Sequence, residues 1–236
     1  MEQYDVIVVG GGPGGSTCAA YLAISGKKVL LVEKSEFPRD KTCGDAVGGK
    51  SLQHVHEIGA HDAVISGQHY KYTGITMTSP NGNSMTVPLH GNEFAHNTAG
   101  YVVKRNLLDN AVFSAAKKHV EENGGTVLQN TSVKNVIWSD ETNTKDPGAG
   151  SKELRVAKGI KFKDKNKKEG EAFAQVVIGA GGYNCPVARE LVIDTFEEKY
   201  QERGHWSGAF REYYTGVKGC KPENGEMEIH FVKGIL

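Results

Sequence analysis

The chain has 236 residues, of which 38% are hydrophobic, and its 28 Lys and Arg residues balance 28 Asp and Glu residues. This length can hold one large domain or two packed ones, and the composition is adequate for a globular core. Zero net charge creates no general field that attracts nucleic acid, and no apolar run approaches the roughly 20 residues of a membrane span. We therefore expect a cytoplasmic protein that binds no nucleic acid, with peripheral membrane contact left open.

The first residues predict a strand that turns directly into a helix. Val6 to Val9 form a continuous apolar run, as a parallel strand buried on both faces requires. Gly10, Gly12 and Gly15 follow with G-x-G-x-x-G spacing, and the helix starts near Pro13. In this motif the glycines allow a tight turn, close approach of a diphosphate and close packing of the helix on the sheet. The helix N-terminus then faces the diphosphate.

A second buried strand and an acidic residue complete the unit. Val29 to Val32 return to the sheet, and Glu33 ends this strand 18 residues after Gly15. A carboxylate at this place accepts hydrogen bonds from the adenosine ribose hydroxyls and repels a 2′-phosphate. The combination predicts an adenine-dinucleotide site that disfavours NADP.

The remaining pattern predicts a mixture of helices and strands. Turn formers and charges dominate the segment after Glu33, which is typical of a loop over a ligand. The predicted elements that follow are a helix over Ser51 to Ile65, a hairpin over Tyr70 to Leu89 with its turn at Pro80 to Gly82, a helix over Arg105 to His119, and strands over Thr126 to Leu128, Ser132 to Trp138, Leu154 to Phe162 and Ala172 to Ile178.

Three further segments have distinct patterns. Asp140 to Lys152 is predicted to be a surface loop, and Lys163 to Lys168 a solvated hairpin tip rather than a binding patch. Alternation through Ala209, Arg211 and Tyr213, resumed from Met227 to Phe231, predicts a returning antiparallel sheet. The apolar end at Leu236, with no closing helix, leads us to expect an incomplete polypeptide.

Cysteines and histidines point to neither a disulfide framework nor a metal site. The four cysteines are widely scattered without a C-x-x-C pair, which is typical of reduced thiols: Cys18, Cys43, Cys185 and Cys220. His54 and His56 would point to different faces of a helix, so with His61 they favour a solvated surface over a metal site.

Four motifs in order resemble one family. They are the glycine loop, PRDKTCGD at 38–45, VKRNLLD at 103–109 and VVIGAGGYNCPVAR at 176–189. Together they resemble the geranylgeranyl reductase family of FAD-dependent oxidoreductases, within the para-hydroxybenzoate hydroxylase-like group. The resemblance implies an α/β fold: a Rossmann-like, GR2-type FAD-binding domain at 1–66 and 101–204, and a discontinuous, mainly antiparallel β-sheet substrate domain starting at 67–100 and 205–236 and truncated there.

The resemblance also implies which residues hold FAD. Glu33 and the glycine loop would bind the ADP half, residues 39–45 would approach the ribityl chain and flavin ring, and Arg105 would stabilise the diphosphate or ribityl region. The full set of implied cofactor residues is Gly10, Gly12, Pro13, Gly14, Gly15, Glu33, Lys34, Arg39, Cys43, Gly44, Asp45, Arg105, Val133, Gly179, Ala180 and Gly181. Residues 179–182 match the second flavin motif, although the wider group usually has Asp where this chain has Gly181.

The implied activity is saturation of carbon–carbon double bonds in geranylgeranyl or other prenyl chains, with Cys43 as the candidate catalytic residue. A thiol beside the flavin can donate a proton, but Cys43 could also only pack against the ring. The implied partners are a prenyl lipid or prenylated small molecule and an electron donor, NAD(P)H or ferredoxin. Two alternatives stay open: an FAD-dependent aromatic monooxygenase of the same fold, and a non-catalytic FAD-binding fragment of a split or truncated enzyme.

Overall fold

The structure is a computed structural model that describes residues 3–91, 99–143, 154–195, 199–202, 204, 207–220 and 222–234. Its residues form two compact units. Unit 1 comprises residues 1–39 and 112–208, and unit 2 comprises residues 40–111 and 209–236. The domain boundaries expected from the sequence stay a prediction, and each unit is described separately below.

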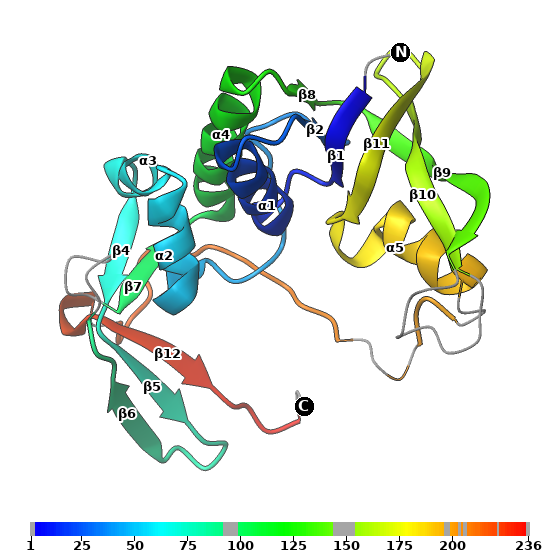
Figure 1. The fold of residues 1–236 in the computed structure, drawn as a ribbon. Coiled ribbons are helices and arrows are strands. Elements are labelled where there is room, and N and C mark those ends of the chain that lie inside the picture. Colours follow the sequence, from blue (N-terminus) through cyan, green and yellow to red (C-terminus); the bar gives the residue numbers. More distant parts are fainter. Residues whose placement is uncertain are drawn as a thin grey trace. The chain divides into compact units, whose positions relative to one another are not determined.

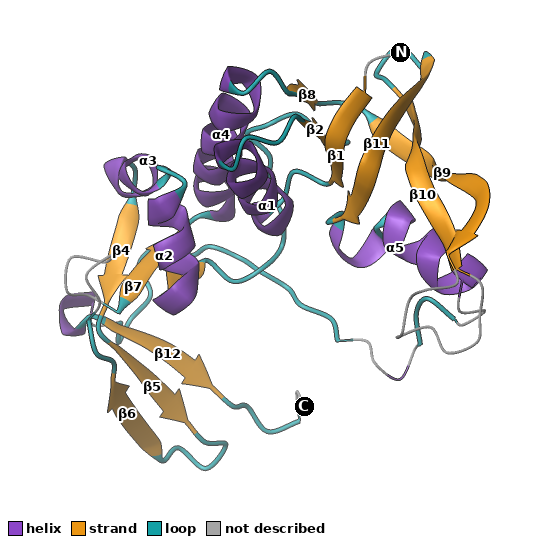
Figure 2. Ribbon diagram, in the orientation of Figure 1, coloured by secondary structure: helices purple, strands orange, loops and turns teal. Residues whose placement is uncertain are grey.

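Unit 1 is built on a six-stranded mixed sheet (Figure 2). In spatial order the strands are β8 (Thr126–Leu128), β2 (Val29–Val32), β1 (Gln3–Val9), β11 (Glu169–Gly179), β10 (Leu154–Lys163) and β9 (Ser132–Asn143). The first four are parallel, whereas β10 pairs antiparallel with both β11 and β9. The carboxyl ends of β1 and β2 therefore lie at the same edge, where ligands of parallel sheets bind.

Both faces of this sheet are covered, which explains the continuous apolar runs in β1 and β2. On one face, Val8 and Leu31 pack with residues of α1 (Pro13–Ile24) and with Phe113 and Val120 of α4 (Arg105–Glu122). Figure 1 shows α1 and α4 together on this face. On the other face, Ile7 packs with side chains from β9, β10 and β11 and from the segment that leads into α5 (Pro186–Glu190).

Unit 2 contains two three-stranded sheets. One has the order β12 (Glu226–His230), β5 (Gly74–Thr78), β6 (Ser84–Pro88); the other has the order β3 (Ala46–Gly48), β7 (Gly100–Val103), β4 (His69–Tyr72). Helices α2 (Gly49–Glu57) and α3 (His61–Ser66) follow β3. The hairpin predicted over Tyr70 to Leu89 is the shorter pair β5–β6, because residues 70–72 belong to β4, which pairs with β7 in the other sheet. The predicted strands of unit 1 correspond to β8, β9, β10 and β11.

Three expectations are corrected. The helix expected over Ser51 to Ile65 is two helices, because the chain turns at Gly59 with φ of +73°. Residues 207–213 form no strand, and β12 pairs with β5 in parallel, not antiparallel. The loop expected over Asp140 to Lys152 starts later, since β9 continues to Asn143, and the rest of that range lies outside the described residues.

Among the described helices, none has both the length and the apolar character required to cross a bilayer.

Candidate functional site

The glycine loop joins three segments of unit 1 through backbone contacts. The Gly10 amide donates to the Val32 carbonyl at 2.8 Å, and the Ala180 amide donates to the Val9 carbonyl at 2.8 Å. A methyl group on Gly15 would overlap the Gly10 carbonyl oxygen, so glycine is needed where α1 crosses the loop. The first and second flavin motifs of the sequence thus meet at the carboxyl ends of β1 and β11.

The N-terminus of α1 presents its amides next to open space. The helix begins at Pro13, whose missing N–H costs nothing at a first helical position. An added methyl group on Gly14 would have no neighbour within 4 Å, and one on Gly12 would meet only Arg39 Nη2 at 3.5 Å. A diphosphate placed here could accept the unpaired first-turn N–H groups and interact favourably with the helix dipole.

Glu33 is 5% exposed, and backbone donors fix its carboxylate. The Gly11 amide donates to Oε2 at 2.7 Å, and the Ser35 amide donates to Oε1 at 2.9 Å. Each carboxylate oxygen keeps a further lone pair, so the group can still accept hydrogen bonds from ribose hydroxyls. Arg39 Nε lies 3.9 Å from Oε1 and supports the negative charge.

A cavity of about 280 Å³ lies beside Glu33 in unit 1. Five of the predicted cofactor residues line it: Gly10, Glu33, Lys34, Val133 and Gly181. Its position next to Glu33, the carboxylate predicted to bind the ribose, makes it the candidate adenosine site. Other residues that line it were not expected from the sequence: Thr131, Ser132, Asn184, Pro186 and Arg189. The last three belong to the second flavin motif at residues 176–189, so the motif could have indicated them as cavity residues.

Arg39 is held at the glycine loop by aromatic contacts. Its guanidinium lies 4.8 Å from the centroid of the Phe37 ring, and Phe37 stacks on Phe113 with ring centroids 4.0 Å apart. Together with its contacts to Gly12 and Glu33, this position leads us to propose the diphosphate, rather than the ribityl chain, as the partner of Arg39. A planar guanidinium can pair with two phosphate oxygens.

In unit 2, Cys43 lies beside a buried ion pair. Arg105 is 6% exposed and Asp109 is 1% exposed. Arg105 donates from Nε and Nη2 to the two Asp109 oxygens at 2.8 and 3.0 Å, and the Cys43 side chain lies near enough to the guanidinium to influence its pKa. Burial acts to lower the Arg105 pKa, but the hydrogen bond and charge of Asp109, with a contribution from Cys43, raise it. The exposed thiol of Cys43 therefore lies near a permanent cation.

The loop that carries Cys43 is fixed by the extended segment at 207–213. Arg211 pairs with Asp40 and Asp45 and donates to the Lys41 carbonyl at 3.0 Å. The Tyr213 hydroxyl donates to Asp45 at 2.8 Å. The hydrogen bond from Arg211 holds the pKa of Asp40 below its usual value, while burial and then Asp45 raise the pKa of Tyr213. Arg211 and Tyr213 were expected as strand residues, and their role in this loop was not predicted.

Within the described ranges, no three His, Cys, Asp or Glu side chains are grouped in a way that could hold a metal ion.

Comparison with known proteins identifies the family. The family described as FAD binding domain matches residues 3–213, which is most of the chain. The chain belongs to this family. The FAD binding domain family and its FAD-dependent structural relatives confirm the predicted α/β flavoprotein fold and the predicted cofactor, FAD. The family is one of FAD-dependent oxidoreductases. The assignment of individual residues to FAD stays a proposal.

Similar curated proteins carry several different names. The chain is 37% identical over 145 residues to conditioned medium factor receptor 1 of Dictyostelium discoideum, covering 59% of this chain and 28% of that protein. It is 34% identical over 127 residues to menaquinone reductase of Mycobacterium tuberculosis, covering 54% and 29%. It is 30% identical over 195 residues to digeranylgeranylglycerophospholipid reductase of Methanosarcina acetivorans, covering 82% and 41%. The chain thus spans less than half the length of these relatives.

Similar solved structures include both a halogenase and a reductase-like protein. The myxobacterial chondrochloren halogenase CndH matches with a TM-score of 0.63 at 25% identity, covering 78% of this chain and 38% of that one. A geranylgeranyl bacteriochlorophyll reductase-like protein of Thermoplasma acidophilum matches with a TM-score of 0.59 at 28% identity, covering 78% and 40%. Reductases and halogenases are therefore about equally similar in fold.

Proposed function

We propose that the protein is an FAD-dependent reductase that saturates carbon–carbon double bonds of prenyl chains, of the geranylgeranyl reductase type. The observation that carries the proposal is the Cys43 thiol held beside the buried Arg105–Asp109 pair. Support comes from the alignment over 82% of the chain with a digeranylgeranylglycerophospholipid reductase. The proposed substrate is a prenyl lipid or prenylated small molecule, and the proposed electron donor is NAD(P)H or ferredoxin.

The residues around the glycine loop and those around Cys43 have different tasks in this proposal. FAD, when bound, supplies the hydride. Glu33, Arg39 and the α1 N-terminus orient the ADP half of the cofactor. Cys43 keeps a proton on Sγ and delivers it to one alkene carbon, so that hydride and proton together saturate the bond; water then restores the thiol. Arg105 stabilises the thiolate that remains after the proton has left.

The test is an anaerobic assay of the protein with chemically reduced flavin and a geranylgeranylated lipid. Mass spectrometry should find the substrate enlarged by one H2 for each saturated double bond. Cys43→Ala should lower the single-turnover rate by at least about tenfold, in the range of a general acid, and should change the pH profile. Cys220→Ala, which alters another exposed thiol, is the matched control. Unchanged turnover of Cys43→Ala would remove the proposed role of Cys43, and absence of any saturated product would remove the proposed reaction.

A monooxygenase or halogenase activity is the second candidate. The halogenase CndH matches the fold with a TM-score of 0.63, and fold does not determine the reaction. The same preparation distinguishes the two: substrate-dependent oxygen consumption with oxygen in the product supports the monooxygenase, while saturation without oxygen supports the reductase.

The third candidate is a non-catalytic FAD-binding fragment. The chain spans 41% of the Methanosarcina reductase, so the residues needed for turnover can lie elsewhere in a longer polypeptide. An absorption spectrum of the washed chain tests cofactor binding first. Turnover by the chain alone would contradict the fragment candidate, whereas FAD binding without turnover would support it.

A further inference from the structure

Six lysines line two hollows of unit 1, at strands β9, β10 and β11, the turn between β10 and β11 and the residue after Glu33, and we call them the lysine surface. They are Lys34, Lys134, Lys161, Lys163, Lys165 and Lys167. The hollows have volumes of about 510 and 470 Å³ and share Lys134 and Lys163. Three carboxylates line the same hollows, so positive charge is in excess here although the whole chain is neutral.

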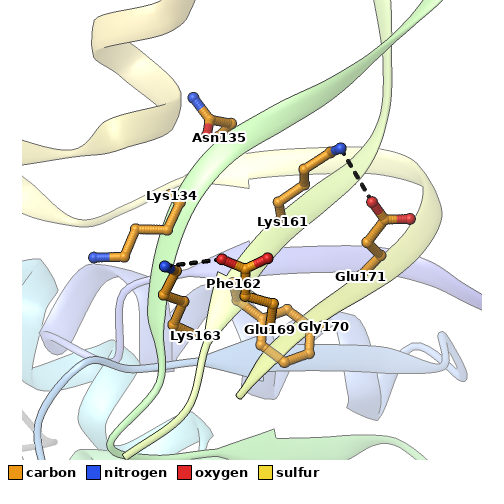
Figure 3. Close-up of a pocket in the computed structure, with 8 residues that line it drawn as sticks. All are labelled: Lys134, Asn135, Lys161, Phe162, Lys163, Glu169, Gly170 and Glu171. Atoms are coloured by element: carbon orange, nitrogen blue, oxygen red, sulfur yellow. Dashed lines mark ion pairs between the residues drawn. The ribbon is translucent and has the colours of Figure 1, made fainter. Parts of the chain in front are cut away.

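A β-bulge in β9 presents Lys134 to this surface. Asn135 pairs with Lys161 and Val133 pairs with Phe162, which leaves Lys134 without a residue opposite it on β10. Such a bulge redirects a side chain that would otherwise follow the alternation of the strand. Figure 3 shows the result: the ammonium groups of Lys134 and Lys163 project to the same side of the sheet.

The three carboxylates are already engaged. Lys163 Nζ pairs with Glu169 at 2.8 Å, and Lys161 Nζ pairs with Glu171 at 3.1 Å (Figure 3). Asp164 accepts the backbone amides of two turn residues at 2.8 and 2.9 Å. Four members of the surface make no ion pair with any residue in the described part of the chain: Lys34, Lys134, Lys165 and Lys167.

The lysine surface is continuous with the candidate adenosine cavity and extends beyond it along β10 and the turn that follows it. Lys34, Ser132 and Lys134 line both the cavity and the adjoining hollow. The charged group of FAD is its diphosphate, which we place at the N-terminus of α1. The described carboxylates leave Lys34 and Lys134, at the edge of the cavity, without an ion pair.

We propose that the lysine surface is a binding site for phosphate groups of a ligand other than FAD. Lysine binds phosphate as a flexible point charge, which suits hollows that are open to solvent. The phosphate could belong to a soluble phosphorylated molecule or to phospholipid headgroups of an anionic membrane surface. The inference does not depend on the proposed reductase activity, because it rests on charge and geometry in unit 1.

The experiment uses the FAD-loaded protein and two probes. Inorganic pyrophosphate is titrated by calorimetry in chloride buffer, and vesicles of phosphatidylglycerol with phosphatidylcholine are compared with pure phosphatidylcholine vesicles by sedimentation. The test variant is Lys134→Gln with Lys165→Gln, and the flavin content of each preparation is measured. The matched control, Lys118→Gln with Lys158→Gln, removes two exposed lysines outside the surface.

We expect wild type to bind at least one probe and the test variant to bind it about tenfold or more weakly, since each lysine near an anionic surface contributes about fivefold. The control variant should stay within about twofold of wild type, and added salt should weaken binding. Pyrophosphate binding would identify a soluble ligand, and binding to anionic vesicles alone would identify headgroups. Absence of binding to both probes, or an equal loss in the control variant, would overturn the proposal and leave a solvated hairpin.

Discussion

Gly12 and Gly15 belong to one loop, yet an added methyl group meets different surroundings at the two positions. At Gly12 it would lie 3.5 Å from Arg39 Nη2 in ordinary contact, and the local φ of −67° suits alanine. We therefore expect Gly12→Ala to change the free energy of unfolding by less than about 0.5 kcal/mol. The methyl group would occupy the approach of the diphosphate, so FAD affinity should fall at least about tenfold, measured by flavin fluorescence titration.

Substitution of Gly15 in the same loop should reduce stability, in contrast to Gly12→Ala, which should reduce only FAD affinity. Gly15→Ala would place its methyl group on the Gly10 carbonyl oxygen. We therefore expect the free energy of unfolding to fall by about 2 kcal/mol or more. Gly208→Ala, where the methyl group has no neighbour within 4 Å, should affect neither property. If Gly12→Ala bound FAD as tightly as wild type, the assignment of the diphosphate to this loop would be wrong.

The four cysteines differ in their surroundings, and their alkylation rates should differ accordingly. Cys43 and Cys220 are exposed, Cys185 is buried, and burial raises the pKa of Cys18. We predict that iodoacetamide at mildly alkaline pH modifies Cys43 and Cys220 before the other two, because the thiolate must be formed and accessible. If Cys43 lies beside the flavin, saturating FAD should slow its alkylation and leave Cys220 unchanged. Peptide mass mapping measures both rates, and equal rates for Cys43 with and without FAD would contradict that placement.

At the level of elements, the extended segment at 207–213 stabilises the Cys43 loop through side chains rather than through a backbone ladder. Arg211 contacts three groups of the loop, and Tyr213 contacts one. Such a segment has the alternating polarity of a strand because alternate side chains point to opposite sides in any extended chain. The sequence could not distinguish this arrangement from a sheet, since the partners Asp40 and Asp45 are more than 160 residues away.

The pair of Arg211 and Asp40 predicts acid sensitivity. The pKa of Asp40 in the folded state is lowered, chiefly by the hydrogen bond from Arg211. Asp40 therefore contributes stability above its unfolded pKa of about 3.9. This stability is lost as the pH falls through the lower folded value. Urea unfolding at about pH 7 and about pH 3 should therefore give a smaller acid-induced loss for Asp40→Asn than for wild type. Glu122→Gln, at an exposed position of α4, should behave as wild type. Equal acid losses in wild type and Asp40→Asn would contradict the prediction.

Elements with local periodic signals were predictable. The apolar runs of β1 and β2, the glycine loop and the helical period of α4 each depend on residues close in sequence, and the structure has these elements. The separation of α2 from α3 depends on the conformation of Gly59, and the parallel pairing of β12 with β5 depends on tertiary packing. Neither property is encoded in a local pattern.

The candidate site was predictable to a similar extent. Glu33 and the glycines followed from spacing, and Val133 followed from the family resemblance; the structure places all of them around one cavity or loop. Arg189 and Asn184 were missed because their motif was interpreted through its glycines alone. Asp109 was missed because its buried pairing with Arg105 resembles an ordinary i,i+4 surface pair in the sequence.

For the whole molecule, the structure predicts that the ADP half of FAD supplies most of the cofactor-induced stability of unit 1. A ligand that binds only the folded state stabilises it by about 2.7 kcal/mol at a hundredfold excess over Kd, which is several degrees in Tm for a chain of this size. FAD and ADP should both raise the Tm, whereas FMN, which lacks adenosine, should not. Glu33→Gln removes the proposed anionic acceptor of the ribose hydroxyls. Because hydrogen bonds to charged groups contribute about 1.5–3 kcal/mol, the Tm increases with FAD and with ADP should both become smaller. Differential scanning fluorimetry with the three ligands measures these shifts. A Tm increase with FMN equal to that with FAD would mean that the cavity beside Glu33 is not the adenosine site.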